Sequence, residues 1–482
     1  MTKVDLTLPP GLTLPLMSEM IMPLSNAAMR DIETLVHPYT NLALHRETGP
    51  LVINRGEGVF VYDEHGKAYL EGMAGLWCAA LGYGNEELAE VAARQIRTLS
   101  FTHLFGGKSH DPAIELAEKL KEIAPSPMSK VFFTCSGSEA NDTQVKLIWY
   151  MNNALGRPQK KKIISRIKGY HGVTIASASL TGLPNNHIDF DLPIPGILHT
   201  GTPHHYRNAV PGESEVDFAT RLADELEALI LKEGPETIAA FIAEPIMGAG
   251  GVIIPPTTYF EKIQEVLQRH DVVLIADEVI CGFGRTGKMW GSQTFDMQPN
   301  ALSCAKALTS AYFPLGAVMI DERMYDALVS ESRKIGTFGH GFTYSGHPVG
   351  SAMALKTIEI YQRERIVEKV AAKAPQFQKR LKALADHPLV GETRGIGLIG
   401  ALEMVADKTS KRSFEAKKMV GAACIKHCEK EGLILRNLPN DTIGICPPLV
   451  ISEAEIDLLF DRLTTALDKT EADVSAQNLR AA

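Results

Sequence analysis

The fold is decided by the stretch VFFTCSGSEAN, residues 131–141. Its apolar first half predicts a short buried strand, and small residues then lead directly into a helical pattern that starts near Ser138. Such a junction places free backbone N–H groups, and the positive end of a helix dipole, where a phosphate or another anion can bind. A serine here is equally typical of an ordinary helix cap, so the stretch alone leaves both roles open.

Strands and helices continue to alternate along the centre of the chain. Helical patterns cover residues 86–99, 112–123 and 138–151, and short apolar runs cover 131–133, 163–164, 238–243, 272–276 and 316–320. Buried strands between helices predict an α/β fold with a mainly parallel sheet. Later helical patterns at 348–364, 367–385 and 453–467, with strands near 397–404 and 433–435, predict a smaller α+β domain formed by both termini. We expect domains at residues 1–83, 84–345 and 346–482.

The composition excludes several classes of protein. The 482 residues are 45% hydrophobic and 22% charged, which rules out a collagen-like or wholly disordered chain. Forty-nine lysines and arginines against 57 acids give a net charge of −8, which argues against nucleic-acid binding. Seven cysteines, mostly in apolar runs, favour a reducing, cytoplasmic location over a disulfide scaffold. We expect no metal, because Cys424, His427 and Cys428 lack a second ligand pair at zinc-site spacing.

Two segments come close to known signals without matching them. The apolar stretch 6–22 is interrupted by prolines and by Glu19, so we expect no signal peptide. The segment GFGRTGKM at 282–289 nearly forms a phosphate-binding P-loop, but Met289 stands where that motif needs serine or threonine. Nor does any run of about 18 apolar residues predict a membrane span.

Three other segments carry polar groups at or near the ends of apolar runs. They are GYHG (169–172), LIADE (274–278) and SCAKAL (303–308), which holds the lone lysine Lys306. A buried lysine is costly unless its amine is paired or used covalently. With the N–H groups near Ser138, these segments supply an anion cradle, an aromatic face, a carboxylate and an amine. Pyridoxal 5′-phosphate (PLP) requires this set of groups from a protein.

An ordered series of motifs resembles the class III aminotransferases of PLP fold type I, and most closely the ω-amino acid or amine:pyruvate transaminases. The motifs lie between about residues 38 and 449: GMAGLWC (72–78), SGSEA (136–140), YHG (170–172), EPIMGAGG (244–251), DEV (277–279), AKALTS (305–310) and GFTYSGHP (341–348). The resemblance implies a large domain with a seven-stranded, mainly parallel sheet flanked by helices. It also implies a homodimer with shared active sites.

Carried over residue by residue, the resemblance makes Lys306 the Schiff-base lysine and proton shuttle, and Asp277 the partner of the pyridine nitrogen. The implied cofactor-binding residues are Ser136, Gly137, Ser138, Tyr170, His171, Glu244, Asp277, Val279, Lys306 and, from the neighbouring subunit, Thr343. Glu244 has a structural alternative, as the acid of a Glu-Pro turn. Ala307 and Ala311 depart from the family, because relatives commonly have glycine at both positions, yet neither change removes a functional group.

The substrate pockets are implied to comprise Tyr39, Trp77, Phe105 of the neighbouring subunit, Tyr170, Ala249, Phe342 and Arg436. Arg436 aligns with the mobile arginine of amine:pyruvate enzymes, although a surface arginine at a strand end is the alternative. We therefore expect a ping-pong Schiff-base transfer from an amine or ω-amino acid to pyruvate. A glutamate/2-oxoglutarate enzyme remains the runner-up if Arg394 or Arg285 supplies a second cation. A PLP-binding scaffold without transfer activity is the alternative from another class.

Overall fold

The computed structural model describes residues 24–481, which form two compact units. Residues 24–55 and 61–68 make the first unit, and residues 56–60 and 69–481 make the second. The stretch 6–22, for which we expect no signal peptide, lies outside the described residues. The expected domain boundaries at residues 83/84 and 345/346 stay a prediction.

The first unit contains two short helices, α1 (Asn26–Thr34) and α2 (Leu42–Thr48). Strands β1 (Ile53–Glu57), β2 (Phe60–Asp63) and β3 (Ala68–Glu71) contain residues of both units. A tight turn follows β2, where Asp63 Oδ1 accepts the backbone N–H groups of His65 and Lys67, both at 2.9 Å. Side-chain acceptors of this kind favour turns, because they satisfy N–H groups that no strand partner reaches.

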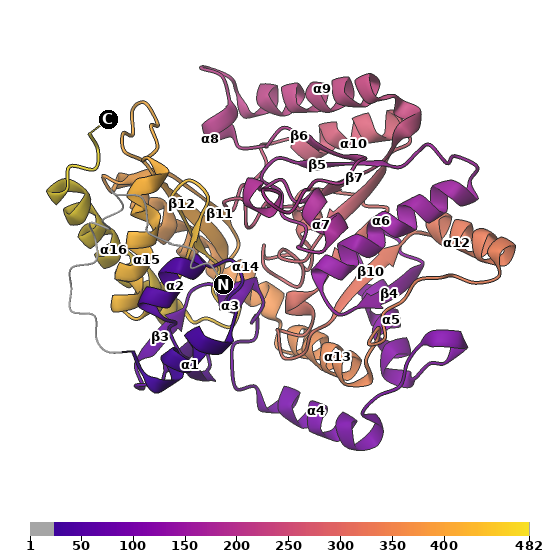
Figure 1. Cartoon of the computed structure of the whole chain (residues 1–482), viewed down its shortest axis with the longest axis horizontal. Helices are drawn as coiled ribbons and strands as arrows, with labels where there is room; N and C mark the ends of the chain where they lie inside the picture. Colours follow the sequence, from indigo (N-terminus) through magenta and orange to yellow (C-terminus); the bar gives the residue numbers. More distant parts are fainter. Residues whose placement is uncertain (1–23, 482) are drawn as a thin grey trace, which may run out of the picture. The chain divides into compact units, whose positions relative to one another are not determined.

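A seven-stranded sheet forms the centre of the second unit (Figure 1). Its strands are β4 (Lys130–Thr134), β5 (Lys162–Arg166), β6 (Ile197–Thr200), β7 (Ile238–Ala243), β8 (Val273–Asp277), β9 (Ala301–Cys304) and β10 (Gly316–Ile320). They lie in the order β4-β10-β9-β8-β7-β5-β6. All neighbours pair in parallel except β10, which runs antiparallel to both β4 and β9. The expected mainly parallel sheet of seven strands is confirmed.

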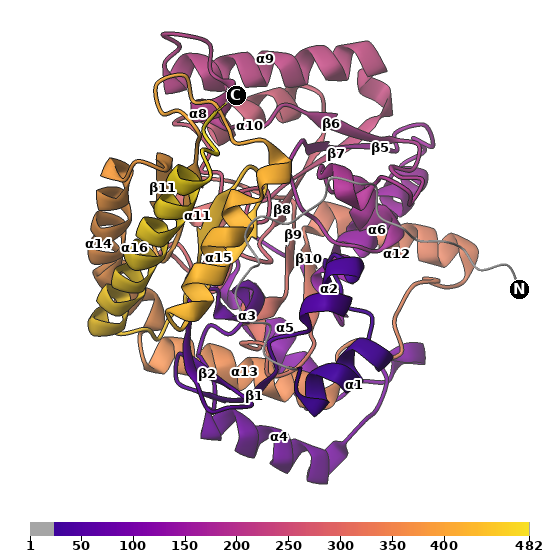
Figure 2. The same cartoon turned by 60° about the vertical axis from the view of Figure 1, so that its left-hand side comes forward.

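Successive side chains of a strand point to opposite sides of the sheet, so both faces of this sheet are apolar. Helices cover both faces. Phe241 and Leu274 pack with helices α9 (Glu215–Glu233) and α10 (Tyr259–Arg269). Ile242 and Ile275, one residue later on the same strands, pack with α6 (Gly137–Ala154) and α12 (Glu322–Ile335). Figures 1 and 2 show α9 beside α10 and α6 beside α12. The remaining helices before residue 345 are α3 (Ala74–Trp77), α4 (Glu86–Leu99), α5 (Asp111–Ile123), α7 (Ile175–Leu180), α8 (His205–Asn208) and α11 (Gly291–Thr294).

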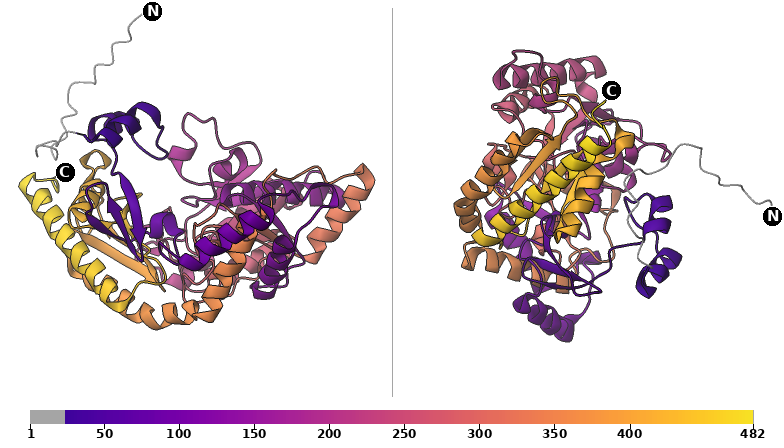
Figure 3. Two further views of the ribbon diagram at one scale, coloured as in Figure 1. Left: turned by 90° about the horizontal axis from the view of Figure 1, so that it is seen from below. Right: turned by 90° about the vertical axis from the view of Figure 1, so that its left-hand side faces the viewer.

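After residue 345 an antiparallel sheet forms, in the order β11-β12-β15-β14. Its strands are β11 (Val390–Ile396), β12 (Ile399–Met404), β14 (Arg436–Leu438) and β15 (Thr442–Ile445), and the helices are α13 (Pro348–Arg363), α14 (Ile366–Ala383), α15 (Val420–Lys430) and α16 (Glu453–Ala476). Helices α15 and α16 lie side by side (Figures 2 and 3). The short strand β13 (Leu433–Ile434) pairs in parallel with Leu70 and Glu71 of β3. Within residues 24–481, no helix combines the length and apolar character needed to cross a membrane.

Candidate active site

Five of the predicted site residues lie at or just beyond the carboxyl ends of five strands. Ser136 follows β4, Tyr170 follows β5, Glu244 follows β7, Asp277 ends β8, and Lys306 follows β9. Since these strands all run in one direction, their ends meet at one edge of the sheet, which is where ligands of such folds bind. The structure therefore brings together residues that lie up to 170 positions apart in the chain.

Asp277 is a buried carboxylate held by three donors. Its Oδ2 accepts the amide of Asn141 at 2.7 Å and pairs with Nδ1 of His171 at 2.8 Å. Its Oδ1 accepts the backbone N–H of Val279 at 3.2 Å. Charge-assisted hydrogen bonds of this kind fix the orientation of a carboxylate. Asn141 is a site residue that the sequence reasoning missed, although it lies one turn after Ser138 on the same face of α6.

Glu244 holds two loops rather than facing the site with a free carboxylate. Its Oε1 accepts the backbone N–H of Tyr170 at 2.9 Å, and its Oε2 accepts that of Gly248 at 2.9 Å. Burial raises the pKa of Glu244, and His171 acts in the opposite direction. These contacts favour the structural alternative, in which Glu244 ties the segment after β5 to the EPIMGAGG segment after β7. Ala249 lies within that second segment and is partly buried.

The junction between β4 and α6 has the predicted strand-to-helix form, but the expectation that Ser138 caps the helix is wrong, because α6 begins at Gly137 and Ser138 lies in its first turn. The Ser136 side chain caps α6 by accepting the N–H of Glu139 at 3.1 Å. Ser138 Oγ accepts the N–H of Val173 at 3.1 Å, which joins the junction to the segment after β5. A methyl group added at Gly137 would lie 3.0 Å from the Val279 side chain, so Val279 packs directly on the start of the helix. Phosphate binding by this cradle stays a prediction.

Lys306 has a left-handed backbone, with φ of +49°. Such a conformation is unfavourable for a residue with a side chain and is concentrated at functional sites. Burial lowers the pKa of its amine, while the negative charges of Asp277 and Glu244 oppose that shift. Ala311, one of the two departures from the family, also has a positive φ, +64°.

Lys306 and Arg436 both lie near the ring of Trp77. The Lys306 Nζ is 5.9 Å from the centroid of the Trp77 ring, and the Arg436 Cζ is 5.2 Å from it. The indole is therefore near both cations. Three buried polar atoms of the site have no hydrogen-bond partner within residues 24–481: Trp77 Nε1, His171 Nε2 and Asn141 Oδ1. Buried polar atoms without a partner are rare in proteins, and a bound ligand commonly supplies one.

Phe105, Phe342 and Thr343 form a separate group. A methyl group at Gly341 would lie 3.0 Å from Phe105 Cζ, so the loop before Phe342 packs on the Phe105 ring. Phe105 is 49% exposed, and Thr343 is also exposed. Tyr39 belongs to the first unit, where it follows α1 and is exposed. The roles of these residues in a site shared between subunits stay predictions.

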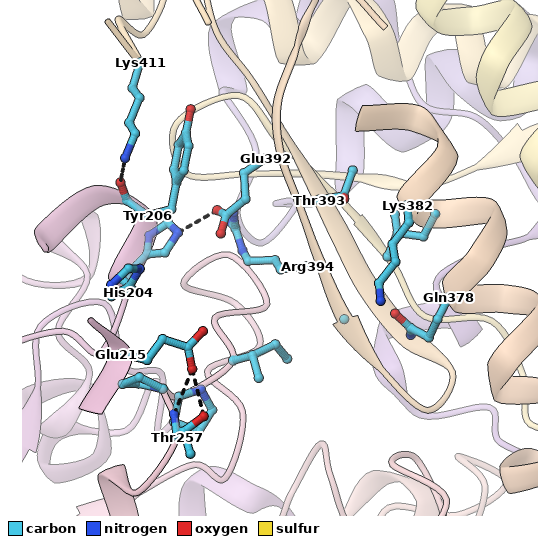
Figure 4. A pocket seen from close by; sticks show the side chains of 16 residues that line it. His204, Tyr206, Glu215, Thr257, Gln378, Lys382, Glu392, Thr393, Arg394 and Lys411 are labelled. Carbon is cyan, nitrogen blue, oxygen red and sulfur yellow. Dashed lines mark hydrogen bonds and ion pairs between the residues drawn. The ribbon is translucent and has the colours of Figure 1, made fainter. Parts of the chain in front are cut away.

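The two arginines considered as a second substrate cation are both occupied. Arg394 on β11 donates to the Gly251 carbonyl from Nε at 2.9 Å and from Nη2 at 2.7 Å, and its Nη1 donates to Glu392 and Glu403. Figure 4 shows it lining a cavity of about 530 Å³ together with Glu392, His204 and Tyr206. Arg285 is buried and donates to the carbonyls of Leu398 and Pro447.

Comparisons with known proteins agree with the geometry of this edge. The family model described as aminotransferase class III matches residues 43–467. The chain is 51% identical over 438 residues to a γ-aminobutyrate transaminase 3 of Solanum lycopersicum, described as chloroplastic, which covers 91% of this chain and 84% of that protein.

Two solved structures are similar throughout. The ω-transaminase of Pseudomonas jessenii, in complex with PMP, superposes with a TM-score of 0.92 at 55% identity and covers 94% of this chain and 99% of that one. A structure described as a transaminase with L-Ala has a TM-score of 0.87 at 56% identity, covering 88% of this chain and all of that one (100%).

Proposed function

The chain belongs to the class III aminotransferases, and from its site geometry we propose that it transfers an amino group from an amine or ω-amino acid to pyruvate. Enzymes of this family use PLP. The observation that carries the choice of pyruvate is the position of Arg436, whose Cζ lies 5.2 Å from the centroid of the Trp77 ring, while Arg394 and Arg285, the two arginines considered as a second cation, donate to protein groups. Glutamate and 2-oxoglutarate carry two carboxylates, which call for a second available cation.

The residues of this site fit PLP. The phosphate of PLP requires N–H donors, which the start of α6 at Gly137 offers. Its ring nitrogen requires a carboxylate, which Asp277 offers, and its aldehyde requires an amine, which Lys306 offers. When bound, PLP supplies an electron sink for the bond broken at the substrate carbon. We propose that Ser136, Gly137 and Ser138 bind the phosphate, that Tyr170 and Val279 contact the two ring faces, and that His171 orients Asp277.

Two residues hold or move protons in the proposed reaction. Asp277, held in place by Asn141, His171 and Val279, would keep the proton of the pyridine nitrogen in place. Lys306 must present a neutral amine to act as nucleophile and base, and its burial favours that form. We propose that its Nζ removes the proton from the substrate carbon and returns it to the cofactor. Glu244 acts as a positioning residue by holding Tyr170 and Gly248.

The pocket that binds the keto acid is proposed to use Arg436 as a bidentate donor to the carboxylate. Trp77 and Ala249 supply apolar walls, and the unpaired Trp77 Nε1 is a second donor within reach of the same region. Relatives described as γ-aminobutyrate transaminases support an ω-amino acid donor, and the structure described as containing L-Ala supports the alanine/pyruvate pair.

We also propose a homodimer in which Phe105 and Thr343 serve the neighbouring site. Exposed apolar side chains on one surface support it: Phe101 and Tyr344 are 40% and 60% exposed, and their ring centroids lie 5.7 Å apart. Grouped exposed aromatic rings are typical of protein–protein contacts. A cytoplasmic location is proposed from the seven free cysteines, although the tomato relative is described as chloroplastic.

The test compares two half-reactions of the PLP-loaded enzyme by stopped-flow absorbance. Arg436→Ala is expected to raise the apparent KM for alanine and pyruvate tenfold to a hundredfold, because it removes a charge-assisted hydrogen bond of about 1.5–3 kcal/mol. The half-reaction with 1-phenylethylamine, which has no carboxylate, is expected to change far less. Arg436→Lys, which keeps the charge but not the planar fork, is the matched control and should fall between the two. Equal losses with both donors, or a large wild-type preference for glutamate over alanine, would contradict the proposal.

A further inference from the structure

The loop that carries Trp77 holds a backbone conformation that its side chains disfavour. Between β3 and Cys78, φ is +47° at Ala74, +67° at Gly75 and +58° at Trp77. Left-handed conformations at residues other than glycine persist only where the surrounding structure imposes them. Two of these three residues carry a side chain, so contacts outside the loop must hold it.

One contact to the loop comes from Glu71, the last residue of β3, and it adds to the backbone hydrogen bonds within the loop itself, such as Trp77 N–H to the Met73 carbonyl at 2.8 Å. Glu71 Oε1 accepts the backbone N–H of Met73 at 2.9 Å, and the N–H of Gly75 also acts on its carboxylate, lowering its pKa. The base of the loop is fixed to the strands next to Arg436, because Gly72 donates to the Ile434 carbonyl at 2.9 Å and accepts the N–H of Cys446 at 2.7 Å. Glu71 thus binds the part of the loop that lies between this fixed base and Trp77.

No cation neutralises Glu71 among the groups that act on it. Burial raises its pKa to about 7, and the backbone N–H groups of Met73 and Gly75 act in the opposite direction. The titratable groups that face it are the Tyr83 hydroxyl, from the segment after α3, and the Cys446 thiol, from the segment after β15. Burial raises the pKa of both groups, so both are neutral near pH 7. Cys78 lies beside Tyr83 at the other end of the loop.

We propose that Glu71 is a positioning residue for the carboxylate substrate: its ionised carboxylate holds the strained loop 72–78, so that the Trp77 indole stays next to Arg436 and Lys306. This inference rests on the proposed function, because it assumes that the region between Trp77 and Arg436 receives a substrate carboxylate. An ionised carboxylate accepts a backbone N–H more strongly than a neutral carboxylic acid does. The hold on the loop is therefore strongest above pH 7 and weakens as the pH falls.

Ionisation of Glu71 also lowers the stability of the fold. This effect distinguishes the proposed positioning role from a role in stability alone. A carboxyl group whose pKa is higher in the folded than in the unfolded protein lowers the stability of the fold as the pH rises between those two values. For Glu71 that interval runs from about 4.5 to about 7. Glu71→Gln, which cannot ionise, is therefore expected to melt at the same temperature as the wild type or higher at pH 8. A residue kept only for stability would show the reverse.

The test measures kcat/KM for alanine and for 1-phenylethylamine from pH 6 to 9 on the PLP-loaded enzyme. Titration of Lys306 changes kcat/KM for both donors alike. The ratio of the two kcat/KM values therefore reports only the effect of the substrate carboxylate. In the wild type the alanine/amine ratio should rise roughly tenfold, with a midpoint near pH 7, and in Glu71→Gln it should stay low and flat. Glu278→Gln is the matched control: Glu278 is also buried, accepts the N–H groups of Gly291 and Ser292, and has a pKa raised to about 7. It should leave the wild-type rise intact.

A second readout needs no turnover. The tryptophan fluorescence of the wild type should change with a midpoint near pH 7, and this change should be absent from Glu71→Gln and from Trp77→Phe. A persisting rise of the ratio in Glu71→Gln, or a lower melting temperature with equal losses for both donors, overturns the inference. If the wild type does not react with alanine, the proposed function fails, and the fluorescence titration alone decides whether Glu71 controls the loop.

Discussion

Replacing Asp277 by asparagine is expected to leave a folded protein that binds its cofactor. In the wild type Asp277 Oδ2 forms hydrogen bonds with the side chains of Asn141 and His171, while Asp277 Oδ1 accepts the Val279 N–H at 3.2 Å. The asparagine amide can keep its oxygen toward the first two donors and turn its NH₂ toward Val279. That orientation sacrifices one weak hydrogen bond, a cost of about 0.5–1.5 kcal/mol in the free energy of unfolding.

The effect on rate should be much larger, because a neutral amide cannot keep the pyridine nitrogen protonated. Loss of a buried charged partner costs about 3–5 kcal/mol, which corresponds to a roughly 10²- to 10⁴-fold slower reaction. Single-turnover kinetics with alanine, on protein whose cofactor content has been measured by absorbance, give this number directly. Turnover by Asp277→Asn near the wild-type rate, at full occupancy, would refute the assigned role.

Asn141→Ala is the companion variant. It keeps the charge of Asp277 but removes one of its donors at 2.7 Å, so a loss of about tenfold is expected, in line with a charge-assisted hydrogen bond of roughly 1.5 kcal/mol. A loss as large as that of Asp277→Asn would mean that the orientation of the carboxylate, and not its charge, limits the reaction.

The remaining predictions concern the lysine, its neighbouring backbone and the assembly. Lys306→Ala should bind PLP without covalent attachment and lose transamination; borohydride reduction and peptide mapping of the wild type should label Lys306, and labelling of another lysine would contradict the assignment. Ala311→Gly should raise the free energy of unfolding by about 0.5–1 kcal/mol, because φ is +64° there; a lower value in denaturant titration would show that this strain is absent. Light scattering should find a dimer whose activity falls on dilution, and a monomer that stays fully active would exclude shared sites.

Local sequence signals predicted the regular elements well where caps and periodicity agree. Helix α4 occupies the expected residues 86–99, because Asn85 caps it and apolar residues recur at helical spacing. Helix α16 continues to Ala476, past the expected residue 467, since Thr470 and Val474 are buried although charged residues flank them. In the segment GFGRTGKM, Arg285 is buried and donates to the carbonyls of Leu398 and Pro447, contacts that its local sequence does not indicate.

Sequence patterns could not predict which side chains form contacts across the sheet. Nothing local indicates that Asn141 reaches Asp277, 136 positions away, or that Glu392 and Glu403 neutralise Arg394. These partners depend on strand order and register, which bring distant segments to one edge. Glu71 was missed for a related reason: its acid side chain precedes a motif of apolar and small residues, and only the positive φ values of the loop reveal what it holds.

The reversed strand β10 acts as a spacer within the site. It separates β4, which leads to the α6 cradle, from β9, which leads to Lys306, by two interstrand steps of about 4.8 Å each. It also begins at this edge with Gly316, where a methyl group would lie 2.7 Å from the Ser136 carbonyl oxygen. Backbone hydrogen bonding therefore sets the distance between the ends of β4 and β9, which lead to the cradle and the lysine proposed to bind the cofactor. In the proposed site, substitution of Trp77 or Arg436 can change the substrate while that distance stays constant.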